Sequence, residues 1–191
     1  MKSFIRSTQD LIRFLVVAAQ DFARTGTLLP STKAAGQAIA SHLPTNKAVI
    51  VEYGSGSGAV VESILCRIDS ESRLVGIEMN EKFFDILKKI SDSRFLSVHQ
   101  EVSLAAKNLK SFAASGVDAV VSGIPFSLIP KAERKSIVDD TFNGLKAGGV
   151  FIVYQYTPAM YKSLRSVFKT VEIHFEPRNI PPYFILVAKK Q

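Results

Sequence analysis

The sequence has little cysteine, no tryptophan and no long apolar run. Cys66 is the only cysteine among 191 residues, which excludes an internal disulfide and is typical of a reducing compartment. Its place in a predicted helix favours a buried structural thiol. No run approaches the roughly twenty apolar residues that a membrane span requires, and His42, His99 and His174 lack metal-ligand spacing. We therefore expect a cytoplasmic protein with no metal site.

Positive charge is in clear excess. Lysine and arginine number 24 against 17 acidic residues, a formal net charge of +7, and the pI is near 9.5. This balance favours an anionic partner, either nucleic acid or an anionic membrane surface. The hydrophobic content of 47% and the length fit a single α/β unit with a substantial core.

The central feature is a strand followed by a glycine turn and a helix. Ala48 to Val51 is apolar and β-branched, which predicts a strand buried on both faces. Gly54, Gly56 and Gly58 follow, and apolar residues at helical spacing resume at Ala59. This order is typical of the nucleotide-binding corner of a doubly wound sheet.

Two carboxylates bear on the choice of nucleotide. Glu78 ends the next predicted strand, where it can accept hydrogen bonds from ribose hydroxyls. Gly54, Gly56 and Ala59 also fit the dinucleotide pattern, so NAD stays open on the glycines alone. Glu52, however, would repel a pyrophosphate and suits the cationic amino group of S-adenosylmethionine. The chain also has no room for the substrate domain of a dehydrogenase, so the methyl donor is favoured.

The rest of the chain alternates predicted strands and helices. It predicts an α/β fold with a Rossmann-like, seven-stranded, mostly parallel sheet, helices on both faces and a C-terminal antiparallel hairpin. Gly148 and Gly149 are predicted to stop a helix before the fifth strand. The predicted strands are Ala48–Val51, Leu74–Glu78, Phe95–His99, Val117–Val121, Val150–Tyr156, Val171–Phe175 and Tyr183–Ala188. The predicted helices lie in 33–43, 80–90, 102–112, 131–145 and 158–168.

Residues Met1 to Phe22 have the pattern of a basic amphipathic helix. Two interpretations stay open: a helix packed on the domain, and a helix lying in a membrane interface. We divide the chain into residues 1–45, with this helix and a connector helix, and residues 46–191, which bind the cofactor. Together they form one structural unit, and we expect a monomer.

Ligands of open α/β sheets lie beyond the carboxyl ends of the strands. Successive predicted strand tips here carry polar groups, and Glu101 is placed to accept from an adenine amino group, with Met79 and Val102 as apolar walls. The predicted cofactor-binding residues are Glu52, Gly54, Ser55, Gly56, Gly58, Glu78, Met79, Glu101, Val102 and Ser122.

The order of these motifs resembles that of class I S-adenosylmethionine-dependent methyltransferases over about residues 48–156. Four further stretches are similar to bacterial phospholipid N-methyltransferases: Gly26-Thr-Leu-Leu-Pro-Ser31, Ser122-Gly-Ile-Pro125, Gln155-Tyr-Thr157 and Asn179-Ile-Pro-Pro182. The resemblance implies S-adenosyl-L-methionine as cofactor, S-adenosyl-L-homocysteine as product and phosphatidylethanolamine as acceptor. It also implies that the N-terminal helix attaches the enzyme peripherally to the inner face of the cell membrane.

Some residues depart from these families. Gln100-Glu-Val102 stands where Gly-Asp-Ala is common, and Ile124 where leucine is usual. The rRNA adenine dimethyltransferases are also similar in glycine loop and charge, but there Asn-Leu-Pro-Tyr holds the target base. Ser122 and Phe126 take those places here, which weakens the RNA alternative. A small-molecule methyltransferase and a cofactor-binding protein without a methyl acceptor also stay open.

The predicted catalytic residues follow from the chemistry of methyl transfer to an amine. The acceptor must lose a proton, for which water, a backbone carbonyl and Glu52 are candidates. The lipid phosphate needs a donor, first Arg178 and second Tyr156. The predicted catalytic residues are Glu52, Tyr156 and Arg178, and the predicted substrate-binding residues are Arg178, Asn179, Tyr183 and Phe126. Tyr53, Phe126 and Tyr183 are candidates for cation–π contact with a methylated ammonium.

Overall fold

The computed structural model describes residues 31–191. The predicted amphipathic helix Met1–Phe22 lies outside the described residues. The first described helix, α2 (Lys33–Ala40), begins at its N-cap residue Thr32, whose side chain accepts a hydrogen bond from the Ala35 N–H. Within residues 31–191, no helix is long and apolar enough to span a bilayer.

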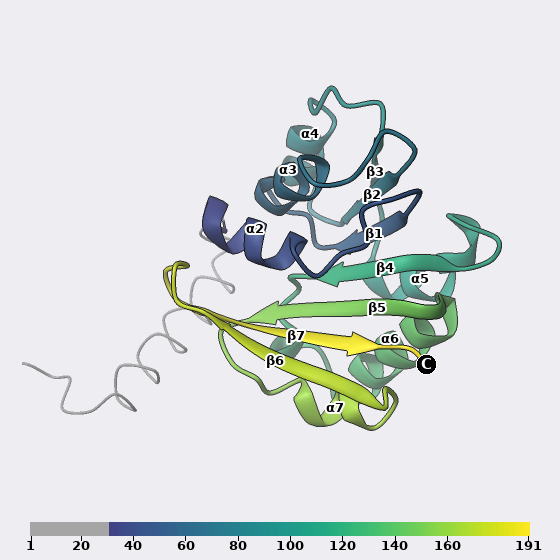
Figure 1. Ribbon diagram of the computed structural model, residues 1–191, viewed down its shortest axis with the longest axis vertical. Coiled ribbons are helices and arrows are strands. Elements are labelled where there is room, and N and C mark those ends of the chain that lie inside the picture. Colours follow the sequence, from purple (N-terminus) through teal and green to yellow (C-terminus); the bar gives the residue numbers. More distant parts are fainter. Residues whose placement is uncertain (1–30) are drawn as a thin grey trace, which may run out of the picture.

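Seven strands form one sheet in the order β3-β2-β1-β4-β5-β7-β6 (Figure 1). The strands β1 to β5 run parallel, whereas β7 is antiparallel to both of its neighbours, β5 and β6. This topology confirms the predicted Rossmann-like fold. The bounds are β1 Val49–Tyr53, β2 Arg73–Glu78, β3 Phe95–His99, β4 Val117–Ser122, β5 Leu145–Gln155, β6 Thr170–Glu176 and β7 Tyr183–Lys189.

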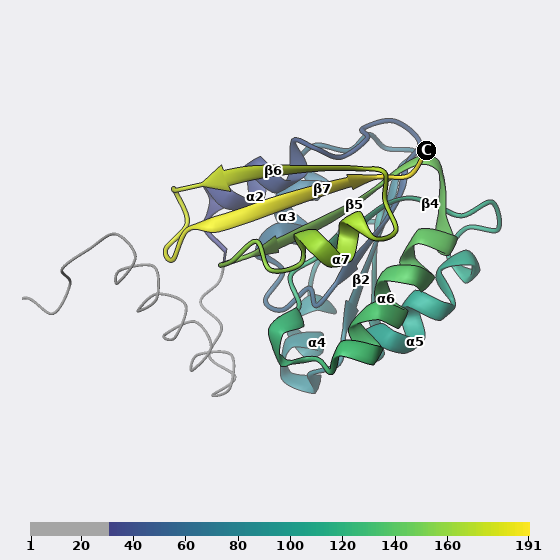
Figure 2. The ribbon, with the colours of Figure 1, turned by 90° about the horizontal axis from the view of Figure 1, so that it is seen from below.

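Helices cover both faces of the sheet, as Figure 2 shows for α5, α6 and α7 on one side. Ile50 and Val51 are both fully buried but belong to different core clusters, because successive side chains of a strand point to opposite faces. A strand buried on both faces explains the apolar run before the glycines. On one face lie α2, α3 (Ala59–Leu65) and α4 (Glu81–Leu87); on the other lie α5 (Val102–Lys107), α6 (Lys131–Gly144) and α7 (Tyr161–Arg165), with 3-10 turns η1 (Leu109–Ser111) and η2 (Phe126–Leu128).

The prediction for Gly148 and Gly149 was wrong in one respect. Helix α6 ends at Gly144, and β5 begins at once at Leu145, so both glycines lie within the strand. Residues 146–149 lie between the ladder pairs Val117–Leu145 and Ala119–Val150, where the register shifts at a bulge or similar irregularity. Gly148 has φ +76°, a conformation that glycine adopts without strain.

The prediction for Cys66 was also wrong, because the residue is exposed. Helix α3 ends at Leu65, and Cys66 is its C-cap. The thiol therefore lies beyond the helix face that packs on the sheet.

Candidate active site

A glycine loop joins β1 to α3 at the carboxyl end of the sheet. Gly54, Gly56 and Gly58 have φ of +72°, +52° and +88°, a region that other residues rarely adopt. A Cβ on Gly54 would lie 2.7 Å from Cγ2 of Ile124, so this glycine permits contact with the segment after β4. A Cβ on Gly56 would meet no atom within 4 Å. The loop is therefore packed at one end and open to a ligand in the middle.

The Glu78 carboxylate holds this loop in place from the tip of β2. Oε2 accepts a hydrogen bond from the Gly56 N–H at 2.9 Å, and Oε1 accepts one from the Asn80 N–H at 2.8 Å. Each carboxylate oxygen keeps a second lone pair for a ligand. Glu78 thus links the glycine loop to the start of α4.

Glu52 is fully buried below the loop, and both of its carboxylate oxygens lack a hydrogen-bond partner. Burial raises its pKa to about 8; the nearby Ser55 hydroxyl opposes this shift, and the charge of Glu78 adds to it. The hydroxyls of Ser55 and Ser122 are likewise buried without a partner. Buried polar groups are normally hydrogen-bonded, so these atoms fit a polar, cationic ligand group.

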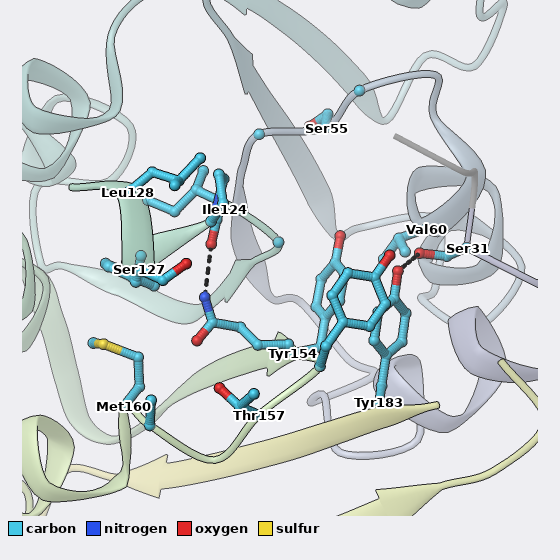
Figure 3. A pocket seen from close by; sticks show the side chains of 18 of the residues that line it. Ser31, Ser55, Val60, Ile124, Ser127, Leu128, Tyr154, Thr157, Met160 and Tyr183 are labelled. Atoms are coloured by element: carbon cyan, nitrogen blue, oxygen red, sulfur yellow. Dashed lines mark hydrogen bonds between the residues drawn. The ribbon is translucent and has the colours of Figure 1, made fainter. Parts of the chain in front are cut away.

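A cavity of about 360 Å³ adjoins the glycine loop. Its walls come mainly from this loop, from the segment between β4 and α6, from the end of β5 and the residues that follow it, and from the first residue of β7. The Gln155 side chain closes one wall by donating from Nε2 to the Ile124 carbonyl at 3.0 Å. Figure 3 shows this contact across the cavity from Ser31 and Val60.

Three tyrosine rings form an aromatic wall of the cavity. The Tyr183 ring packs against both Tyr154 and Tyr156, at centroid distances of 5.3 Å and 5.1 Å. The Tyr183 hydroxyl lies 3.2 Å from the Ser31 hydroxyl, as Figure 3 shows. Burial raises the pKa of both Tyr154 and Tyr156 above the ordinary phenol value, so both are neutral near pH 7. Neutral electron-rich rings attract an ammonium group.

The predicted cofactor residues fall into two groups. Gly54, Ser55 and Gly56 line the cavity, while Glu52, Gly58, Glu78 and Ser122 do not. Met79, which is 64% exposed, Glu101 and Val102 lie at the tips of β2 and β3, outside this cavity. An adenine site at these three residues stays a prediction.

The predicted substrate residues also divide. Phe126, Tyr156 and Tyr183 line the cavity, but Arg178 and Asn179 do not. These two lie in the loop between β6 and β7, where internal hydrogen bonds hold them.

Both side chains of that loop already have partners. The Arg178 guanidinium donates from Nε and Nη2 to the Glu176 carboxylate at 2.8 Å and 2.6 Å, and this contact lowers the pKa of Glu176. Asn179 Oδ1 accepts from the Thr32 N–H, and its Nδ2 donates to the Pro181 carbonyl. The loop is thereby fixed to the start of α2.

The structure also corrects the set of aromatic candidates. Tyr53 is fully buried, and its hydroxyl lies 3.2 Å from that of Thr141, away from the cavity. Tyr154 and Arg134 line the cavity but were missed. The tip of the fifth strand, where Tyr154 and Tyr156 flank Gln155, could have indicated Tyr154. No sequence pattern marks Arg134, which reaches the cavity from α6.

Known methyltransferases resemble this chain in sequence or in structure. The ornithine lipid N-methyltransferase of Singulisphaera acidiphila is 27% identical over 178 residues, covering 91% of this chain and 93% of that protein. The precorrin-6y C5,15-methyltransferase of Geobacter metallireducens has a TM-score of 0.65 and 19% identity over 82% of this chain and 88% of that one. A 16S rRNA methyltransferase of T. thermophilus, solved with AdoMet and guanosine, has a TM-score of 0.61 and 18% identity over 81% of this chain and 40% of that one. No protein-family model matches.

The sheet order, the glycine loop and these likenesses show that the chain has the fold of the class I S-adenosylmethionine-dependent methyltransferases. The corner fits S-adenosylmethionine on three counts: an open glycine backbone at Gly56, a carboxylate on the loop at Glu78, and the unpaired carboxylate of Glu52 for a cationic amino group. The relative from Singulisphaera acidiphila is an N-methyltransferase of ornithine lipid.

Proposed function

We propose that this protein transfers a methyl group from S-adenosylmethionine to the amine of a lipid head group. The observation that carries the proposal is the wall of three tyrosines, Tyr154, Tyr156 and Tyr183, in a cavity that opens onto the glycine loop. Aromatic faces suit an amine that becomes a more methylated cation. The likeness to an ornithine lipid N-methyltransferase along nearly the whole chain supports a lipid acceptor.

The bound cofactor supplies an electrophilic methyl group on a sulfonium centre. The chain's own contribution is to position the amine and to exclude water, which carries most of the acceleration in such a displacement. Phe126 and Met160 supply apolar surface to the cavity, and Gln155 fixes its wall. Glu52 is buried below the loop and does not line the cavity, so it is not placed to take the proton from the amine. The proton of the ammonium leaves to water or a backbone carbonyl.

The surface next to the cavity supports approach to a membrane. Ile173, Phe175 and Ile180 of the β6–β7 hairpin are 46%, 59% and 76% exposed, and Phe175 packs on Phe184. The same hairpin supplies Tyr183 to the cavity. Exposed lysine and arginine side chains lie on and just after the neighbouring α7, at Lys162, Arg165 and Lys169. Exposed apolar side chains and exposed cations on elements that contact each other suit an anionic bilayer surface.

The decisive test is transfer of labelled methyl to phosphatidylethanolamine and to ornithine lipid in separate anionic liposomes, with ribosomal RNA in a parallel tube. Label in either lipid supports the proposal and identifies the head group. Label in RNA alone overturns it and makes the basic surface a nucleic-acid site. No label in any tube, despite cofactor binding, leaves a methyltransferase fold with a different acceptor.

Membrane contact is tested on the same liposomes. The double variant Phe175→Ser/Ile180→Ser should lower liposome binding and lipid methylation together, and deletion of Met1–Phe22 should do the same. Leu96, 56% exposed on the opposite edge strand β3, gives the control Leu96→Ser. An equal loss in this control would argue against a membrane surface at the hairpin.

A further inference from the structure

The tyrosine-lined cavity contains one charged side chain among the described residues that line it, Arg134. It lies in the first turns of α6 and donates from Nη2 to the Ile129 carbonyl at 3.0 Å. Its Nε is buried and has no hydrogen-bond partner. A buried donor without a partner is rare in folded proteins, so this atom is placed to meet a ligand.

The charge of Arg134 is also not balanced within the described chain. Arg94 and Arg178 each pair with a carboxylate two residues away, at Asp92 and Glu176, whereas no ion pair of residues 31–191 includes Arg134. The N-terminal end of a helix carries partial positive charge, which disfavours a cation there. Neither the helix dipole nor a carboxylate of the described residues therefore accounts for the charge of a guanidinium at this position.

We propose that Arg134 binds the anionic group of the lipid head group, so that the enzyme recognises a zwitterion and not a simple amine. This rests on the proposed lipid-amine function. Phosphatidylethanolamine and ornithine lipid share the required chemistry, because each has an oxyanion, phosphate or carboxylate, a few bonds from its amine. The tyrosine wall attracts the ammonium and Arg134 attracts the oxyanion. A guanidinium suits this role because its fork of N–H donors matches two oxygens of a carboxylate or phosphate.

The assignment moves the anion site from the predicted Arg178 to Arg134. Arg178 lies outside the cavity, and its guanidinium is held by Glu176. Arg134 has an unpaired donor and lines the cavity itself. The oxyanion therefore lies on the α6 side of the cavity, and its distance from the tyrosines selects the head group.

The test measures binding of soluble head-group fragments by calorimetry, on protein saturated with S-adenosylhomocysteine. Glycerophosphoethanolamine carries the phosphate, Nα-acetylornithine carries the carboxylate, and ethanolamine carries neither. Arg134→Gln should weaken binding of at least one anionic fragment by tenfold or more and leave ethanolamine unchanged. Arg134→Lys should bind the anionic fragments with an affinity between those of wild type and Arg134→Gln. An ammonium keeps the charge of the guanidinium but lacks its fork of N–H donors. Lys135→Gln is the matched control, because Lys135 is exposed and pairs with Asp139 on the same helix.

The outcomes separate this inference from the proposed function. An equal loss of ethanolamine or S-adenosylhomocysteine affinity in Arg134→Gln would show a structural role and overturn the inference, as would unchanged fragment binding or a loss confined to Arg178→Gln. In liposomes, Arg134→Gln should raise KM at least tenfold and change kcat little. Fragment binding that depends on Arg134, without lipid methylation, would retain the anion site and refute the lipid function. Lipid methylation by Arg134→Gln with an unchanged KM would retain the lipid function and refute the anion site.

Discussion

The Tyr154 side chain lies directly against the backbone of Gly123: a Cβ added to Gly123 would be 2.2 Å from the Tyr154 hydroxyl oxygen and 2.4 Å from its Cζ. The Gly123 N–H also donates to the Tyr53 carbonyl at 3.2 Å. The segment after β4 and the tyrosine of β5 are therefore positioned together, and the shape of the cavity depends on a residue with no side chain.

Gly123→Ala should displace Tyr154 and lower methyl transfer at least tenfold. Overpacking of this kind also lowers the free energy of unfolding, by about 1–3 kcal/mol. Thermal unfolding and the KM for the acceptor would be measured together. Full activity in this variant would show that the position of Tyr154 does not matter for catalysis.

Glu52 should make the stability of the free protein depend on pH. Its pKa rises from an ordinary 4.5 to about 8 on folding. The neutral form is thus favoured in the folded state, and its contribution is fully present below pH 4.5 and is lost as the pH rises through about 8. Denaturant unfolding from pH 5 to 8 should show wild type losing stability relative to Glu52→Gln, by up to a few kcal/mol. Parallel pH profiles would contradict the raised pKa.

Cofactor binding should release a proton from Glu52. A cationic amino group beside the carboxylate lowers its pKa, so the affinity of wild type should rise between pH 6 and 7.5, by up to about tenfold per pH unit. Calorimetry with S-adenosylhomocysteine in buffers of different ionisation enthalpy measures the released proton directly. Glu52→Gln should bind S-adenosylhomocysteine more weakly than wild type and release fewer protons on binding.

Glu78→Gln should loosen the glycine loop. The amide nitrogen cannot accept, so the variant loses one of the hydrogen bonds from Gly56 and Asn80. Hydrogen bonds to charged groups contribute about 1.5–3 kcal/mol, and cofactor affinity should fall about 10- to 100-fold. Glu81→Gln, exposed at the start of α4, is the control. Equal affinities for wild type and Glu78→Gln would show that this contact is dispensable.

The tyrosine wall should act through its rings more than through its hydroxyls. Tyr156→Phe keeps the ring and should retain most activity. Tyr156→Leu removes it and should weaken acceptor binding about 3- to 30-fold, the size of a partly desolvated cation–π contact. The ratio of wild-type to Tyr156→Leu affinity should grow with each methyl group that the amine already carries. Equal losses in both variants would instead indicate that the hydroxyl is required.

The fold could be predicted from the sequence because its signals are local. Alternating apolar strands and helices, with glycines after β1, define a Rossmann-like sheet. Gly148 and Gly149 show the limit of such signals, since a glycine pair marks a helix stop and a bulge equally well. Only the pairing of β5 with β4 distinguishes the two.

The meeting of Glu52, the glycines and Glu78 could likewise be predicted, because these residues lie at two adjacent strand ends. The make-up of the tyrosine-lined cavity could not. Arg134 and Tyr154 meet there only because the sheet order brings α6 and β5 beside β4. Arg178 had the right chemistry for an anion, but Glu176, two residues earlier, already binds it.

The antiparallel direction of β7 also decides where a label or tether can be attached without covering the cavity. Tyr183 begins the strand at the cavity, and six residues later the strand ends at Lys189, a rise of about 20 Å away from the cavity. In Figure 1 the C-terminus accordingly lies at the opposite end of the sheet from the start of β7. A dye or surface tether at Gln191 would leave the tyrosine-lined cavity free. In liposome experiments, the depth of such a label would test whether the cavity end of the molecule faces the bilayer.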